Sequence, residues 1–436
     1  MNNLATKYAA LLETQPQKWS QDLAEIERKL AASTARYQGK PINFLYHPIF
    51  FDEADLQKFR YISQMMSQII QKTVQQYLAL PSFREHFGFS AEMEELILID
   101  PGYSCSAPIA RFDIFYDGDF KFCELNGDGT SAMNEANTLE QIFMQAEIIK
   151  QIGADYDISY HELFKSWLTE LLNIYREWGG TKTRPNIAIV DFLGLGSTEE
   201  FEVFQQVFEK AGHTTVICDP RELLYKDNKL YFQDLQIDLV YRRAVNQEVE
   251  KRLAEVEDFI QAYREQAVCV VGPFRSQIMH NKIFFSILHN HEINGYLNAD
   301  ELNFVQKHIP QTTVLSAAAV AQARTQKDAF VLKPQDLYGG KNVICGLDCT
   351  EREWQKLLAR NSKEPNSLLQ EFCNFTQLSL PVFQSDKFSY QPFKTTLGLF
   401  TYNGKFSGLY SRVSQHNVIA GVVNSITLPS LVVKKK

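Results

Sequence analysis

The chain has 436 residues, of which 45% are apolar and 22% charged, a composition typical of a globular protein with room for two or three domains. Its formal net charge of −8 argues against nucleic acid or an anionic membrane surface as the main partner, since either favours a basic face. The seven cysteines include no CxxC pair, and no apolar run reaches the length of a membrane span. We therefore expect a cytoplasmic protein with no membrane and no nucleic-acid partner.

The first third of the chain is predicted to be mostly helical. Apolar residues recur at helical spacing in residues 4–32 and 54–79, and Ile42–Tyr46 between them is typical of a short strand. We interpret this region as scaffolding.

A β-hairpin follows. Arg111–Tyr116 and Asp119–Asn126 alternate in polarity as strands do, and Asp117-Gly118 supplies the positive φ angles of a tight turn. If the turn has two residues, Arg111 lies opposite Glu124.

One face of this hairpin carries three side chains with oxygen ligands. With a period of two, Asp113, Glu124 and Asn126 point to the same face. Two carboxylates and a carboxamide form an all-oxygen ligand set, which Mg²⁺ prefers when it is shared with a nucleotide phosphate. The alternative is a solvated strand face on which Arg111 simply pairs with Glu124.

Helices are predicted after the hairpin. The loop 127–131 leads into a helical stretch, Ala132–Ile149, with Thr130 or Ser131 as its N-cap. A second helix is predicted over residues 160–177.

Residues 186–272 change style, because short apolar strands now alternate with helical stretches as in a βαβ layer. The predicted elements are strand Ile187–Val190, helix Thr198–Ala211, strand Thr215–Cys218, a small hairpin around Asp227-Asn228, and strands Ile237–Tyr241 and Ala267–Val271.

The glycine loop Gly194–Ser197 raises the alternative of a dinucleotide site, because a helix N-terminus after a glycine turn binds anions. The dinucleotide fingerprint needs a third glycine where this chain has Glu199, whose carboxylate would repel a pyrophosphate. A capped loop or part of a substrate pocket fits better, and an NAD-dependent oxidoreductase is the weaker alternative.

A lysine stands inside the next helical stretch. Residues 276–290 are amphipathic, and Lys282 is the cation in the middle of the predicted helix. From the pattern alone, a surface lysine is the ordinary interpretation.

A different sequence pattern begins at residue 329. Phe330–Lys333 and Asn342–Cys345 are predicted strands, joined by a turn that contains Gly339-Gly340 and Lys341. A lysine at the end of an apolar strand, followed by a glycine turn with a second lysine, is suited to covering a polyphosphate.

The last part of the chain is predicted as a helix and more strands. Gln370 and Glu371 lie in the predicted strand Ser367–Phe372, and Arg412 ends the second strand of a hairpin closed by Asn403-Gly404. The remaining elements are helix 350–360, hairpin strands Lys394–Tyr402 and Lys405–Arg412, and strand Ile426–Val433.

Together these segments resemble the ATP-grasp ligases. In that fold the phosphate-covering lysine strand usually precedes the acidic metal-binding strands, whereas here Glu124 and Asn126 come about two hundred residues before Lys333. This rotated order resembles the circularly permuted ATP-grasp family typified by glutathionylspermidine synthetase. The expected fold class is mixed α+β and α/β, with an open βαβ (pre-ATP-grasp-like) subdomain.

The resemblance implies a role for each matching residue. Asp113, Glu124 and Asn126 match the Mg²⁺ ligands, Arg111 a phosphate-facing arginine, and Arg412 the arginine that closes on the transferred phosphate. Residues matching nucleotide contacts are Lys282, Lys333, the loop Tyr338, Gly339, Gly340, Lys341 and Asn342, and the adenine linker Gln370 and Glu371.

The resemblance implies an ATP- and Mg²⁺-dependent carboxylate–amine ligase that forms an acyl phosphate and releases ADP and phosphate. Its partners would be a small-molecule or peptide carboxylate and an amine. After Glu124-Leu125-Asn126 this chain continues with Gly127-Asp128-Gly129-Thr130, whereas the synthetase has Ala-Asp-Thr-Pro. The resemblance therefore does not imply glutathione and spermidine as the substrates. The main alternative is a nucleotide-binding scaffold without catalysis.

Three domains are expected. They are a helical region with the metal-binding hairpin over residues 1–180, the βαβ subdomain with the Lys282 helix over residues 181–310, and a nucleotide-covering subdomain with core strands over residues 311–436.

Overall fold

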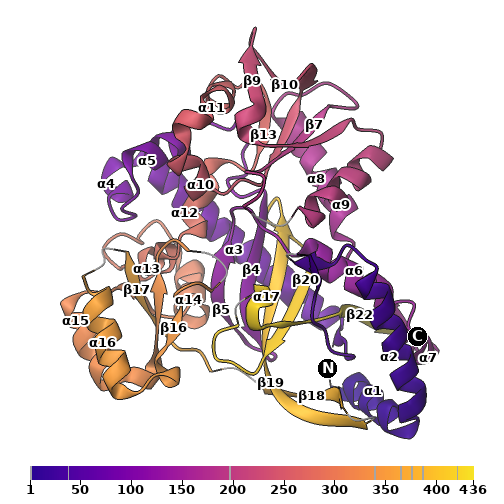
Figure 1. The fold of residues 1–436 in the computed structure, drawn as a ribbon. Coiled ribbons are helices and arrows are strands. Elements are labelled where there is room, and N and C mark those ends of the chain that lie inside the picture. Colours follow the sequence, from indigo (N-terminus) through magenta and orange to yellow (C-terminus); the bar gives the residue numbers. More distant parts are fainter. Residues whose placement is uncertain are drawn as a thin grey trace.

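Strands from both halves of the chain form one antiparallel sheet at the centre of the computed structural model (Figure 1). The strand order is β21-β20-β19-β4-β5, with β18 also paired to β19. The strands are β4 (Ile109–Tyr116), β5 (Phe120–Asn126), β18 (Gln377–Gln384), β19 (Lys387–Tyr402), β20 (Lys405–Ser414) and β21 (Ile426–Leu428). The structure describes residues 2–37, 39–195, 198–337, 340–363, 366–374, 377–384, 387–419 and 421–436.

The predicted hairpin is β4–β5, but its register differs from the prediction. Tyr116 pairs with Phe120 across a three-residue loop, and a bulge at Cys123 shifts the pairing once more. Arg111 therefore lies opposite Asn126, not Glu124. The loop and the bulge each shift the pairing by one residue, so Asp113, Glu124 and Asn126 still share one face of the hairpin.

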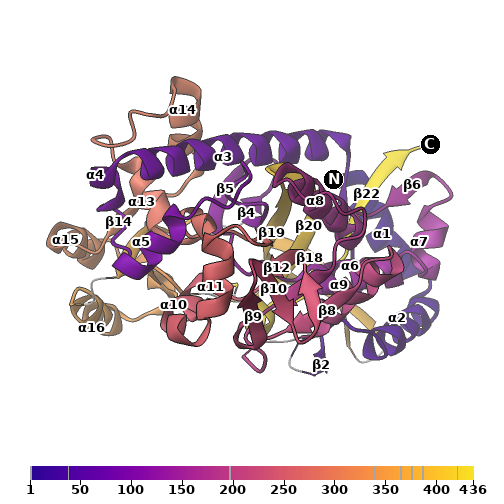
Figure 2. The same cartoon turned by 90° about the horizontal axis from the view of Figure 1, so that it is seen from above.

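Helices cover one face of this sheet. The long helix α3 (Glu53–Ala79) begins at Asp52, whose side chain forms a capping box, and it runs along the sheet (Figure 2). Phe59 and Met66 of α3 share a hydrophobic core with Phe112 of β4. The other helices of this region are α1 (Asn2–Thr14), α2 (Pro16–Ala31), α4 (Pro81–Arg84), α5 (Ala91–Leu98), α6 (Met133–Phe143) and α7 (Glu147–Ile152).

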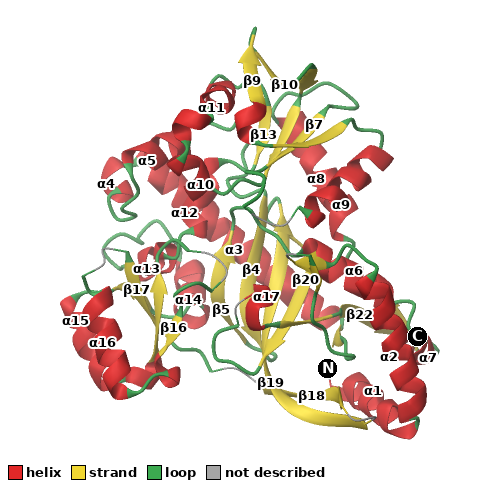
Figure 3. Cartoon of the chain, in the orientation of Figure 1, coloured by secondary structure: helices red, strands yellow, loops and turns green. Residues whose placement is uncertain are grey.

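The predicted βαβ layer is a parallel sheet of order β13-β12-β7-β8. Its central strand β7 is apolar throughout and fully buried, as expected for a strand covered on both faces. Helices flank it (Figure 3). The elements are β7 (Ile187–Val190), α9 (Glu199–Lys210), β8 (Thr215–Cys218), β12 (Leu239–Arg242), α10 (Asn246–Lys251), α11 (Glu257–Arg264) and β13 (Cys269–Val271), with α8 (Leu163–Glu177) packed alongside and strands β9 (Leu223–Lys226), β10 (Lys229–Phe232) and β11 (Leu235–Ile237) extending beyond.

A smaller antiparallel sheet of order β14-β17-β15-β16 packs against two helices. Trp354 and Leu332 lie in their common core, and the Trp354 indole donates to the Ala323 carbonyl at 2.9 Å. The elements are β14 (Thr312–Val314), α15 (Ala317–Thr325), β15 (Phe330–Pro334), β16 (Ile344–Cys345), α16 (Glu351–Asn361) and β17 (Ser367–Glu371), preceded by α12 (Gln277–His280), α13 (Ile283–His289) and α14 (Ala299–His308).

Two predicted strands were wrong. Ile42–Tyr46 is not a strand: Phe44 makes only an isolated bridge to Thr427. The apolar stretch Ile426–Val433 is divided at Pro429 into β21 and β22 (Ser430–Lys435), because proline cannot donate to a ladder. β22 pairs in a separate sheet with β3 (Ile49–Phe51) and β6 (Tyr156–Ser159).

Two predicted helices are interrupted. The stretch Ala132–Ile149 forms α6 and α7 with a break between them. Its N-cap is neither Thr130 nor Ser131 but Ala132, which adopts a left-handed conformation with φ of 80°. The helix predicted over 276–290 breaks after Asn281, so Lys282 stands at the N-cap of α13 and not in mid-helix.

Candidate active site

A cavity of about 670 Å³ lies between the central sheet, the parallel sheet and the smaller antiparallel sheet. Its walls come from β4, β5 and β20 of the central sheet, β15 and β17 of the smaller sheet, the start of α6, and loops of the parallel sheet. Ten of the predicted site residues line it: Arg111, Asp113, Glu124, Asn126, Lys333, Gly340, Lys341, Gln370, Glu371 and Arg412. Sequence reasoning thus brought residues from positions 111 to 412 to one place.

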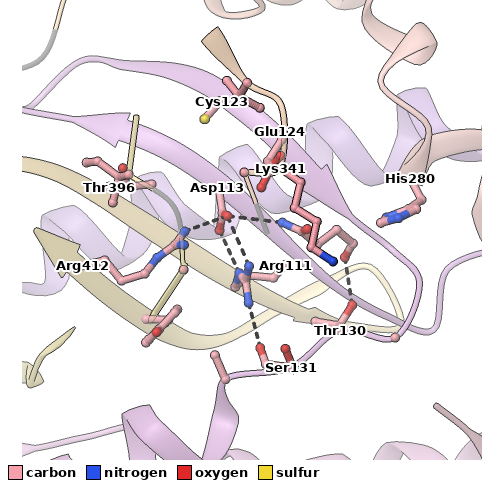
Figure 4. A pocket seen from close by; sticks show the side chains of 18 of the residues that line it. Arg111, Asp113, Cys123, Glu124, Thr130, Ser131, His280, Lys341, Thr396 and Arg412 are labelled. Carbon is pink, nitrogen blue, oxygen red and sulfur yellow. Dashed lines mark hydrogen bonds and ion pairs between the residues drawn. The ribbon is translucent and has the colours of Figure 1, made fainter. Parts of the chain in front are cut away.

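Asp113 is the centre of a buried charge cluster in this cavity (Figure 4). Arg111 Nε donates to Asp113 Oδ1 at 2.8 Å, and Arg412 Nη2 donates to Oδ2 at 2.7 Å. The Asn126 amide nitrogen donates to Oδ2 at 3.2 Å. The β4–β5 pairing and the neighbouring β19–β20 hairpin position these groups, because all four residues stand on strands of one sheet.

Glu124 and two lysines form a second cluster beside the first. Glu124 stands opposite Asp113 in the strand register. Lys282 Nζ lies 3.7 Å from Glu124 Oε2 and donates to the Leu337 carbonyl at 2.6 Å. Lys333 Nζ donates to the carbonyl of Cys123, the bulge residue, at 3.1 Å. The lysine near the end of β15 therefore contacts the backbone of the bulge.

The two lysines do not occupy equivalent places. Lys333 lines the large cavity, whereas Lys282 lines a small recess behind Glu124. We name the group Arg111, Asp113, Glu124, Lys282, Lys333, Lys341 and Arg412 the cation end of the cavity.

Both carboxylates of the cation end stay ionised at neutral pH. Burial by itself would raise the pKa of Asp113, but Arg111 and Arg412 hold it below its ordinary value. Burial and Asp113 likewise oppose ionisation of Glu124, yet Lys282 and Lys333 lower its pKa. Counting Arg111, Arg412, Lys282 and Lys333 against two carboxylates, this end carries excess positive charge before Lys341 is included.

These residues fit a magnesium ion that is shared with phosphate. Asp113, Glu124 and Asn126 share one face, and both carboxylates are ionised, which a hard cation requires. Asn126 now presents its nitrogen to Asp113, and turning the amide would present its oxygen instead. Among the described residues, no three His, Cys, Asp or Glu side chains converge as a preformed metal cluster, so phosphate oxygens would complete the ligand set.

The predicted glycine loop is only partly described. Tyr338 and Gly339 lie outside the described residues. Gly340 and Lys341 line the cavity, and Lys341 is drawn beside Glu124 in Figure 4. Asn342 has a φ of 58° in the turn and is not part of the cavity wall.

The predicted adenine linker borders the cavity in β17. The Gln370 side chain donates to Thr312 Oγ1 at 2.9 Å and so faces the neighbouring strand. The N–H groups of Glu371 and Phe372 already donate to the carbonyls of Gln311 and Ala329. Phe372 and Cys373, which follow the strand, also line the cavity and were not predicted.

A second part of the cavity wall is acidic, and the sequence analysis did not predict it. We name it the carboxylate end. It consists of Asp128, Glu135, Asp191, Glu200 and Arg243. Asp128 pairs with Arg242 at 3.1 Å and Glu200 with Arg243 at 3.0 Å.

The two remaining carboxyl groups have raised pKa values. Burial, with Glu200 nearby, raises the pKa of Glu135 to about 7. Burial raises that of Asp191 to about 6, although Arg243 acts in the opposite direction. A sequence signal was present: Asp191 directly follows the apolar strand β7, and Glu135 lies in the first turn of the helix after the hairpin.

No helix in the described part of the chain is long and apolar enough to cross a membrane.

No protein-family model and no curated protein matches the chain. Among solved structures, a glutathione synthetase-like effector from Globodera pallida aligns with a TM-score of 0.57 at 11% identity, covering 95% of this chain and 97% of that chain. A RimK domain ATP-grasp protein from Sphaerobacter thermophilus (13% identity, TM-score 0.31) covers 56% of this chain and 90% of that chain. D-alanyl-alanine synthetase A from Vibrio cholerae (12% identity, TM-score 0.31) covers 58% and 89%.

The first of these likenesses extends over nearly the whole chain and shows the fold. The mixed fold class is as predicted, and ATP-grasp proteins are among the structural neighbours. The circular permutation, the three domain boundaries and the glutathionylspermidine synthetase subfamily stay predictions.

Proposed function

We propose that the protein is an ATP-dependent carboxylate–amine ligase that activates its acid as an acyl phosphate. The observation that carries this proposal is the cation end, where four buried or nearly buried cationic side chains surround two ionised carboxylates beside a cavity of about 670 Å³. Such a charge arrangement suits a polyphosphate, because the excess positive charge opposes phosphate oxygens in a site of low dielectric.

The chemistry needs positioning and charge neutralisation more than a nucleophilic side chain. A carboxylate is a poor acylating agent because oxide is a very poor leaving group. Transfer of the γ-phosphoryl group to the acid gives an acyl phosphate, which the amine attacks with loss of phosphate. Arg111, Arg412 and Lys333 line the cavity. The two arginines would oppose the charge on the transferred phosphoryl group, and Lys333 would oppose the charge on the phosphates that remain.

A bound Mg²⁺ would be held by Asp113, Glu124 and Asn126 and would neutralise phosphate charge. The structural neighbours named as ATP-grasp ligases agree with this class of reaction in general. Glutathione and spermidine are not implied, because residues 127–130 depart from the pattern of that family.

The two alternatives fit less well. A dinucleotide site at α9 would place a pyrophosphate beside Glu199, Glu200 and Glu202, all in the first turn of that helix. A scaffold without catalysis would have no need of the intact cation end. A thermal-shift screen separates them, since only a ligase responds to Mg-ATP and then turns it over with acid and amine.

The decisive experiment identifies the product of activation. The protein is incubated with Mg-ATP, hydroxylamine and a panel of amino acids, dipeptides and dicarboxylic acids. We expect ADP and a hydroxamate with at least one acid, and transfer of carboxylate ¹⁸O into phosphate. AMP and pyrophosphate as products, or ¹⁸O in AMP, would contradict the acyl-phosphate route, and no nucleotide consumption with any acid would contradict the ligase.

A further inference from the structure

The carboxylate end lies at the topological switch point of the parallel sheet. From β7 the chain passes to β8 on one side and later to β12 on the other. Open α/β sheets bind ligands in the crevice that this arrangement leaves beyond the carboxyl ends of the strands. Asp191 directly follows β7, Arg243 directly follows β12, and both line the cavity. The cavity therefore continues from the cation end into a second place suited to a ligand.

Glu135 belongs to the carboxylate end but is also within electrostatic reach of the cation end. Its carboxylate is influenced by Arg111 of the cation end and by Glu200 and Arg243 of the carboxylate end. Among the described residues, no side chain forms a hydrogen bond or ion pair with Glu135, and its own backbone N–H acts to lower its pKa. It borders the cavity from the start of α6.

The neighbouring Glu200 is already committed to structure. It accepts hydrogen bonds from the N–H groups of Met133 (2.8 Å) and Asn134 (3.2 Å), so it caps α6 from a different helix. Its other oxygen pairs with Arg243. Glu200 therefore fixes the first turn of α6, and both of its oxygens are already engaged in structural contacts.

The same wall contains an unsatisfied donor. Arg243 is 5% exposed, and its Nε is buried without a hydrogen-bond partner among the described residues. Buried polar atoms are rarely left unpaired, so such an atom in a cavity wall points to a group that arrives with a ligand or with water. This observation is independent of the carboxylates.

We propose that the carboxylate end binds the amine substrate as an ammonium ion and that Glu135 is the general base that deprotonates it. This inference rests on the proposed ligase function. The ammonium ion gives one proton to Glu135, the free amine attacks the carbonyl carbon of the acyl phosphate, and the C–O bond to phosphate breaks. The second proton leaves nitrogen with the departing phosphate as hydrogen phosphate, so the products are the amide, hydrogen phosphate and protonated Glu135.

The electrostatic surroundings suit this role. Burial and Glu200 raise the pKa of Glu135 to about 7, while its own backbone N–H, Arg111 and Arg243 oppose the rise. Tyr410 of β20 is the further titratable group that faces it. A base whose pKa lies near the working pH is the most effective one, and such catalysis typically contributes about 10²–10⁴-fold.

The test compares two nucleophiles in Glu135→Gln. Hydroxylamine is largely unprotonated at neutral pH and needs no base, whereas methylamine is protonated and needs one. With an acid found in the hydroxamate assay, we expect Glu135→Gln to lose about 10²-fold or more in amide formation from methylamine. Its formation of ADP and hydroxamate should fall much less. Glu202→Gln, an exposed position on α9, is the matched control and should resemble the wild type with both nucleophiles.

The pH profile provides a readout that a merely structural role would not change. In the wild type, the methylamine rate should rise to a plateau near pH 7, where Glu135 becomes ionised. In Glu135→Gln, the rate should keep rising with slope one above that pH, because only the free amine reacts.

The outcomes are separable. If no acid gives ADP or hydroxamate in the wild type, the ligase itself is wrong. If hydroxamate forms but Glu135→Gln affects both nucleophiles equally or neither, or if the wild type makes no amide from methylamine, the base assignment is wrong.

Discussion

The two ends of the cavity treat their carboxylates in opposite ways. At the cation end, Arg111, Arg412 and the lysines offset the cost of burial, so the pKa values of Asp113 and Glu124 are lowered. At the carboxylate end, ion pairs engage only part of the acidic set, and the pKa values of Glu135 and Asp191 rise to about 7 and about 6. Burial is common to both ends, so the difference lies in the supply of nearby cations.

This difference separates charge stabilisation from proton transfer. Carboxylates that stay ionised over the physiological range can hold a metal and pair with arginines without exchanging protons. Carboxyl groups that titrate near neutrality can accept a proton during turnover. Under the proposed function, the cation end would serve phosphate chemistry and the carboxylate end would serve amine chemistry.

The largest effect is expected from removing a carboxylate of the cation end. Glu124→Ala should lower turnover by about 10³-fold or more, because a proposed Mg²⁺ ligand and the partner of Lys282 are both lost. The variant should remain folded by circular dichroism, with Glu202→Ala as the control. Full activity would remove Glu124 from the site, and so would a Mg-nucleotide complex with the metal more than ~4 Å from Asp113, Glu124 and Asn126.

Lys333 tests whether the same end binds the nucleotide. Lys333→Ala should weaken Mg-ATP binding by about 2–4 kcal/mol, since it removes a buried charge-assisted contact. Isothermal titration with Mg-ATP measures this loss, and Lys356→Ala on the exposed face of α16 is the matched control. Unchanged affinity for Mg-ATP and an unchanged rate would show that Lys333 does not contact the nucleotide.

Strand spacing predicted that Asp113, Glu124 and Asn126 share one face, whereas their association with Lys282 and Arg412 was implied only by the resemblance. Two carboxylates and a carboxamide kept a common face although the loop and the bulge each shifted the register, because two shifts of one residue preserve parity. The predicted partner of Arg111 was wrong because the two shifts together move the pairing by two residues, from Glu124 to Asn126. Period-two reasoning thus identifies the face of a strand more safely than the partner across it.

The carboxylate end could not be predicted in this way. Asp128, Glu135, Asp191 and Glu200 come from loops and helix starts of two different layers, and tertiary packing, including that of α6 against α9, brings them together. Their pKa values depend on tertiary burial, which a local pattern does not contain. The lysine at residue 282 shows the same limit, because the helix break that places it at an N-cap lies inside an unbroken amphipathic pattern.

A glycine tests how closely the cation end is packed. Gly398 of β19 lies opposite Asp113, and a Cβ there would come within 2.7 Å of Arg111 Cδ and 3.0 Å of Asp113 Oδ1. Gly398→Ala should therefore displace the Arg111–Asp113 pair and lower turnover by about 10–100-fold, in line with the sensitivity of catalysis to small displacements. Gly295→Ala has open space around the new Cβ and is the matched control. Equal rates for both variants would show that the pair is not required in this geometry.

The smallest expected effect concerns stability at the carboxylate end. The folded-state pKa of Asp191, about 6, lies above its ordinary value of 3.8, so the folded state favours protonated Asp191. Its contribution to stability is complete below the ordinary pKa and is lost as pH rises through about 6. The free energy of unfolding of Asp191→Asn should therefore rise relative to that of the wild type between about pH 4 and 6.5. Above that range the difference should stay constant, at about 1–3 kcal/mol at most. Thermal melts across this range measure the difference, with exposed Asp234→Asn as the charge control. Asp113, whose pKa is lowered, is present in both proteins, so its contribution to the pH dependence cancels in the difference. A difference between wild type and Asp191→Asn that does not change with pH would show that folding does not raise the pKa of Asp191, and the contrast between the two ends would then rest on Glu135 alone.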